Sequence, residues 1–151
     1  MKTRTVTTDQ LQFRGAEPDE IAYLPNEDTF FTGRVEDFYE NGQKLGEGNF
    51  KDGKRDGLWT EWHKNGQKWT ETNWKDGKPN GLATEWYENG QKEVEANLKD
   101  GKLMSVMVWK SDGEKCPVTN VKDGDGVGVD YESDGTEKYR WTLKDGERVV
   151  D

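Results

Sequence analysis

The sequence contains few apolar residues and very few histidines and cysteines. Of its 151 residues 30% are hydrophobic and 35% are charged, and it contains one histidine and one cysteine. The lone Cys116 excludes a disulfide within the chain, and with His63 it provides no ligand spacing for a metal ion. Any nucleophile–base pair would also depend on His63. We therefore predict no enzyme, no metal site and no cofactor.

Long apolar runs are absent as well, so no segment is predicted to span a membrane. A formal net charge of −9 argues against nucleic acid and against anionic membrane surfaces, because both require a basic protein surface. The same charge suits a partner protein with a basic surface, although it also simply promotes solubility. A lone cysteine and a polar N-terminus predict a cytoplasmic protein, and export with a removed signal peptide is the alternative.

Low hydropathy is typical of disordered chains, but the aromatic content points the other way. The sequence holds seven Trp, five Tyr and five Phe. Aromatic side chains bury large areas and are scarce in disordered segments. These counts predict an ordered fold whose thin core consists of large rings.

Two four-residue sequence motifs recur at intervals of 24 residues. Asn-Gly-Gln-Lys begins at Asn41, Asn65 and Asn89, and Lys-Asp-Gly-Lys begins at Lys51, Lys75 and Lys99. Five repeats can be aligned on these motifs, opening at Gly33, Gly57, Gly81, Met104 and Gly126. The last two repeats have lost the Asn-Gly pair. We predict an N-terminal cap over residues 1–32 and one continuous repeat domain over residues 33–151.

Each repeat has the pattern of a β-hairpin. Apolar and polar residues alternate on both sides of an Asn-Gly pair, which is a strong hairpin turn signal. Glycine pairs interrupt every run before three helical turns could form. The predicted fold class is therefore all-β, an elongated single antiparallel sheet made of consecutive hairpins. The cap is predicted to add two short strands, over residues 10–14 and 21–24.

The predicted register depends on the length of the central loop. A two-residue loop at Asn65-Gly66 would place Trp62 and Trp74 on opposite faces. We predict a three-residue loop over residues 64–66 with Gly66 at positive φ, because it keeps one face apolar through every repeat. The structural aromatic face then comprises Phe38, Phe50, Trp62, Trp74, Trp86, Leu98, Trp109 and Tyr131. The opposite face carries the predicted partner-binding residues Tyr39, Trp59, Glu61, His63, Trp69, Glu85 and Tyr87.

The consensus sequence of one whole repeat resembles that of a known family. Gly-Leu-Trp-x-x-Trp-x-x-Asn-Gly-Gln-Lys followed by Asn-x-Lys-Asp-Gly-Lys, as in residues 57–78, resembles the MORN-repeat-variant proteins of bacteria. This resemblance implies a twisted sheet of hairpins, a protein-binding or scaffold role without catalytic residues, and often the antitoxin component of a toxin–antitoxin pair. Met104 and Cys116-Pro117 depart from the pattern, and Pro117 predicts a strand edge or a bulge there.

Three functions follow, from different classes. The leading hypothesis is a non-catalytic interaction module that binds another protein, in an oligomeric state that the sequence does not reveal. The alternative is a carbohydrate- or choline-binding module that uses Trp62, Trp86 and Trp109 as stacking platforms. Acid–base catalysis by Glu61 and Glu85 is disfavoured, because nearly every repeat carries such a carboxylate whereas catalysis needs one special pair.

Overall fold

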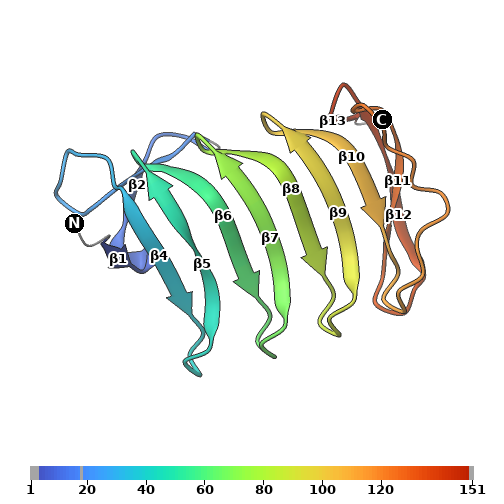
Figure 1. Cartoon of the computed structure of the whole chain (residues 1–151), viewed down its shortest axis with the longest axis horizontal. Coiled ribbons are helices and arrows are strands. Elements are labelled where there is room, and N and C mark those ends of the chain that lie inside the picture. Colours follow the sequence, from blue (N-terminus) through green and yellow to red (C-terminus); the bar gives the residue numbers. More distant parts are fainter. Residues whose placement is uncertain (1–3, 18, 150–151) are drawn as a thin grey trace.

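The structure is a computed structural model that describes residues 4–17 and 19–149. Hairpins follow one another along a long antiparallel sheet, and the two chain ends lie at its opposite ends (Figure 1). This sheet has eight strands in the order β1-β4-β5-β6-β7-β8-β9-β10, and only β1 departs from the hairpin order, by pairing parallel to β4. The predicted all-β meander of hairpins is confirmed.

The strands begin and end close to the two repeated turn motifs. The sheet strands are β1 (Thr5–Val6), β4 (Gly33–Phe38), β5 (Lys44–Lys51), β6 (Lys54–Trp62), β7 (Lys68–Lys75), β8 (Lys78–Trp86), β9 (Lys92–Lys99) and β10 (Lys102–Val108). A short 3-10 helix, η1 (Thr8–Gln10), follows β1. The cap adds the small hairpin β2 (Gln12–Arg14) and β3 (Ile21–Tyr23), close to the two strands predicted there.

The Asn-Gly turns and the Asp-Gly turns lie at opposite edges of the sheet (Figure 1). At the Asn-Gly edge, His63 N donates to Gln67 O and Gly66 has φ of 86°, so the predicted three-residue loop is present. At the other edge, Asp76 and Gly77 have φ of 50° and 79°, as a two-residue type I′ loop requires. Positive φ at both central positions explains why Asp-Gly recurs there.

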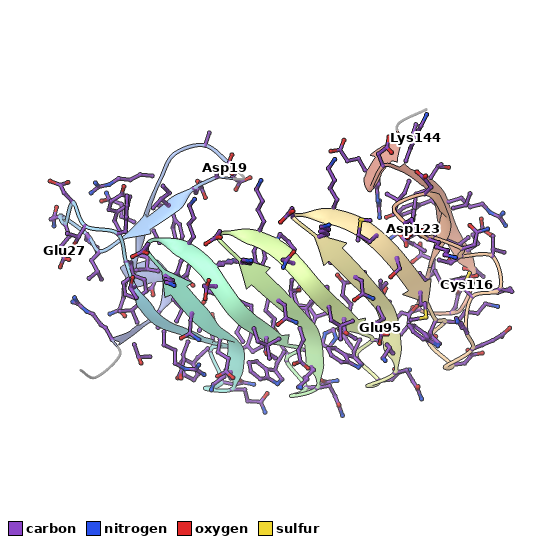
Figure 2. The ribbon with its side chains drawn as sticks, turned by 45° about the horizontal axis from the view of Figure 1, so that its top comes forward. Asp19, Glu27, Glu95, Cys116, Asp123 and Lys144 are labelled. Atoms are coloured by element: carbon purple, nitrogen blue, oxygen red, sulfur yellow. The ribbon has the colours of Figure 1, made fainter. Side chains whose placement is uncertain are left out.

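The C-terminal part departs from the single predicted sheet. β11 (Gly126–Tyr131), β12 (Glu137–Lys144) and β13 (Glu147–Val149) form a separate three-stranded sheet. Between β10 and β11 the chain keeps only isolated bridges, such as Val106 with Val121. This is the segment that contains Pro117, and it ends the regular ladder, as a proline without an N–H donor favours. Cys116 and Asp123 lie at this end of the molecule (Figure 2).

The predicted assignment of side chains to faces is wrong. Trp74 lies opposite Gly57, which shares a face with Trp59 and Glu61, whereas Trp62 directly follows Glu61 and points the other way. The reason is a β-bulge that the sequence does not reveal, since the pairing shifts by one residue between Glu61 and Trp62. One such shift moves every later side chain to the opposite face.

We name the two faces by their residues. The core face carries Val35, Asp37, Phe50, Trp59, Glu61, Thr70, Thr72, Trp74, Ala83, Glu85, Val94, Ala96 and Leu98. The open face carries Arg34, Phe38, Glu47, Leu58, Thr60, Trp62, Glu71, Leu82, Thr84, Trp86 and Glu95. The predicted aromatic face is therefore divided, with Phe50, Trp74 and Leu98 on the core face and Phe38, Trp62 and Trp86 on the open face.

Two hydrophobic cores lie against the core face, one at each end. The first joins the cap residues Val6, Leu11 and Ala22 to Phe50 and Trp59. The second consists of residues from the C-terminal half: Ala96, Val106, Val108, Cys116, Val121, Val129 and Leu143. The middle of the core face, around β7 and β8, belongs to neither core. The end cores therefore cover the ends of the face and leave its centre uncovered.

Candidate binding faces of the repeat sheet

The open face repeats one ion pair in three successive hairpins. Lys44, Lys68 and Lys92 each place Nζ 2.6 Å from a carboxylate of Glu47, Glu71 and Glu95, respectively. Each ammonium also lies near the ring of the tryptophan one strand further along, at 5.9, 5.9 and 5.3 Å from Trp62, Trp86 and Trp109. The charges of this face are thus largely neutralised within the protein.

Between these ion pairs the open face exposes large apolar side chains. Phe38, Leu58 and Leu82 keep between 45% and 50% of their surface accessible. Leu58 and Leu82 occupy the same position of successive repeats, so they form a regular series and not scattered exceptions. An ordered series of exposed apolar side chains rimmed by charge is typical of a protein-binding surface.

Three of the predicted partner-binding residues instead join one hairpin to the next. Tyr39 Oη donates to Trp62 O at 2.5 Å, and Tyr87 Oη donates to Trp109 O at 2.8 Å. His63 occupies the equivalent position, with Nε2 2.9 Å from Trp86 O. Burial, followed by the charges of Glu93, Asp130 and Asp112, raises the pKa of Tyr87 to about 12. These rings are structural bridges, a role that their equivalent repeat positions could have indicated.

The turn asparagines form a second series of bridges. Asn89 Oδ1 accepts from Gln91 N within its own turn at 2.9 Å, while Nδ2 donates to Ser111 O in the next turn at 2.7 Å. Asn65 makes the same pair of contacts, to Gln67 N and Glu88 O. The amide is needed because it supplies an acceptor and a donor at once.

Trp59, another predicted partner residue, is buried on the core face. Its Nε1 donates to Asn49 O at 3.0 Å, and its ring lies at 5.3 Å and 88° from that of Phe50. The Arg55 guanidinium lies over both Trp59 and Trp74, 4.5 and 4.9 Å from the ring centroids. Burial lowers the pKa of Arg55, and Glu61 and Asp37 oppose this change. Trp74 Nε1 is buried without an acceptor among the described residues.

The remaining predicted partner residues, Glu61 and Glu85, lie in register on the core face. Thr70 pairs with Glu61 on one side and with Glu85 on the other, so the two carboxylates flank it across neighbouring strands. Desolvation within the curve of the sheet raises the pKa of Glu85 although its side chain keeps an accessible surface, and the charges of Asp130 and Glu61 raise it further. The predicted partner residues therefore occupy separate environments. Trp69, which the strand pairing skips at the bulge, lies beside His63 with 5.8 Å between the ring centroids.

No group of three or more His, Cys, Asp or Glu within residues 4–17 and 19–149 is placed to hold a metal ion. One cleft of about 480 Å³ lies where the cap meets the Asp-Gly edge, lined by both acids and cations. Over the same ranges no helix has the length and hydropathy to cross a bilayer.

Comparison with known proteins agrees with the geometry. A family model described as MORN repeat variant matches residues 31–52, 55–76 and 79–100. These three segments begin within two residues of the first residue of β4, β6 and β8, and they cover the hairpins whose turns and ion pairs repeat most regularly. No curated protein matches the chain. Residues 31–100 of the chain thus contain three consecutive repeats of the MORN repeat variant type, as the resemblance of the repeated sequence predicted.

Proposed function

We propose that this protein is a non-catalytic interaction module that binds another protein through the open face of its sheet. The observation that carries this proposal is the series of exposed apolar side chains on that face, Phe38, Leu58 and Leu82. Burial of a half-exposed leucine against a partner contributes about 1 kcal/mol. A rigid sheet also loses little conformational entropy on binding, because its hairpins are already joined to one another.

Three finer proposals rest on the family resemblance and the composition. A bacterial antitoxin is one special case, in which the partner is the toxin. A cytoplasmic location accords with the lone cysteine, and a basic partner surface with the net charge of −9. Carbohydrate or choline binding is disfavoured, because lysine ammonium groups already lie near the rings of Trp62, Trp86 and Trp109.

The test is affinity capture with two variants of the full chain. Leu58→Asp together with Leu82→Asp places charge in the proposed interface without disturbing a core. Val149→Asp is the matched control, since Val149 is equally exposed but lies on β13 at the C-terminal end. We expect a specific protein that the wild type and the control retain and the double variant loses. Equal retention by all three chains would refute an open-face interface.

A further inference from the structure

The centre of the core face is an uncovered sheet surface with a distinctive row of residues. Glu61, Thr70 and Glu85 are direct cross-strand neighbours on β6, β7 and β8. Thr72 and Ala83, which pair with each other, form the adjacent small-residue floor. Neither hydrophobic core includes any of these five residues.

The carboxylates of this surface lack partners, in contrast to those of the open face. Glu47, Glu71 and Glu95 each form an ion pair, whereas no cation in the described part of the chain lies within ion-pair distance of Glu61 or Glu85. The same holds for nearby Glu93 among the described residues. The repeat thus neutralises one set of carboxylates and leaves the other set unpaired.

Neighbouring charges make this surface strongly acidic. Burial raises the pKa of Glu93, the charges of Glu85 and Asp130 raise it further, and His63 and Lys138 oppose them. Asp130 belongs to β11, so the C-terminal sheet adds its own carboxylate to the surface. Asp130 also accepts a hydrogen bond from Trp141 Nε1 and lies 3.9 Å from Arg148. Arg55, stacked on Trp59 and Trp74, borders the surface at the cap end.

We propose that the centre of the core face binds an extended lysine- or arginine-bearing segment of the partner protein, with its cations on Glu61 and Glu85. The inference rests on the proposed function, to which it adds a second contact surface and the chemistry of the occupant. The negative charge of this surface is complementary to a cationic ligand. The carboxylates are too far apart to form a metal-binding group among the described residues, so a chain that carries several cations fits them better than a single ion.

The spacing of the carboxylates specifies the segment. Neighbouring strands lie about 4.8 Å apart, so Glu61 and Glu85, two strands apart in register, are separated by roughly 10 Å. In the extended polyproline II conformation a chain advances about 3.1 Å per residue with three residues per turn, so side chains three positions apart lie on one face and span roughly the same distance. The predicted ligand motif is therefore a basic residue at every third position, in a segment that crosses the strands.

The test uses fluorescence anisotropy with the full chain and two synthetic peptides of identical composition. One peptide has lysine at every third position in a glycine–serine background, and the other has its lysines adjacent. We expect the spaced peptide to bind more tightly, and Glu61→Gln with Glu85→Gln to weaken it about tenfold, as the loss of two partly exposed charge pairs implies. Circular dichroism verifies that each variant is folded.

The matched control is Glu71→Gln with Glu95→Gln, which removes the same charge from the open face and should change the affinity less than about twofold. Equal weakening by both double variants would overturn the proposal, as would equal affinity for the two peptides or no binding. Tighter binding of the soluble polyamine spermine would overturn a protein segment as the occupant. Because the peptide replaces the native partner, this test can fail while the open-face interface is upheld, and the reverse also holds.

Discussion

The hydroxyl of Tyr87 donates a hydrogen bond to the backbone carbonyl of Trp109, 2.8 Å away, and so joins the third hairpin to the segment that follows β10. The bond spans two strands, beyond the reach of the sheet ladder itself. Tyr39 and His63 make the equivalent contact in the preceding repeats. Successive hairpin ends are thereby held in a fixed relation, which keeps both faces of the sheet in a defined shape.

Replacing Tyr87 with phenylalanine should therefore weaken the fold. The substitution keeps the ring but leaves the Trp109 carbonyl without this donor, at a cost of about 1 kcal/mol of unfolding free energy. Urea unfolding followed by tryptophan fluorescence measures the change. Tyr139→Phe is the control, because Tyr139 is exposed and its hydroxyl has no hydrogen bond within the described residues. Equal stability of the two variants would contradict a bridging role.

The turn asparagines should not tolerate aspartate. Asn89→Asp keeps the acceptor for Gln91 N but removes the donor to Ser111 O and places a negative charge beside that carbonyl. We expect a loss of about 1 kcal/mol in urea unfolding at neutral pH. Asp112→Asn is the opposite substitution at the equivalent turn position, where the Asp112 carboxylate already accepts a hydrogen bond from Glu114 N. An Asn89→Asp variant as stable as the wild type would argue against turn-to-turn bonding.

Two glycines of β5 should respond differently to alanine. A Cβ on Gly48 would lie 2.1 Å from the Trp59 ring, so Gly48→Ala must displace a buried indole and should cost about 2 kcal/mol. A Cβ on Gly46 would meet only Glu61 Cγ at 3.5 Å and Thr60 O at 3.6 Å. Gly46→Ala should therefore be neutral or slightly stabilising. Thermal unfolding of both variants tests this, and similar losses would contradict the packing of Trp59 over Gly48.

The turn chemistry of this chain could be predicted, because it is local. Asn-Gly and Asp-Gly favour backbone conformations with positive φ, and Gly66 and Gly77 adopt them. The order of hairpins, and hence the fold class, follows from these turns. The loop over residues 64–66 was also predicted correctly, so the error in register arose elsewhere.

The distribution of side chains between the faces could not be predicted, because it depends on the β-bulges. The pairing shifts between Glu61 and Trp62, and again between Glu85 and Trp86, with no glycine or proline to signal it. Each shift moves the following residues of the paired strand to the other face, so Trp74 shares a face with Trp59 and Glu61 and not with Trp62. The bridging contacts of Tyr39, His63 and Tyr87 join residues more than 20 positions apart, so only the equivalence of the three positions in successive repeats could have indicated them.

The raised pKa of Glu85 predicts how stability changes with pH. Since the folded-state pKa exceeds the unfolded one, the folded protein binds more protons between the two values. The contribution of Glu85 to stability is therefore fully present below the unfolded pKa, about 4.3, and is lost as the pH rises through the raised value. Ionised Glu85 destabilises the fold, because its carboxylate is desolvated there and, to a smaller extent, because it is repelled by Asp130 and Glu61.

Glu85→Gln should consequently stabilise the protein at neutral pH, and this gain should vanish near pH 4 or below, where wild-type Glu85 is neutral in both states. Urea unfolding of wild type and variant across that range measures the difference. Glu71→Gln is the matched control, because Glu71 loses an ion pair to Lys68 and should gain no stability at neutral pH. A pH-independent effect of Glu85→Gln, or destabilisation at neutral pH, would mean that the core-face carboxylates do not repel one another.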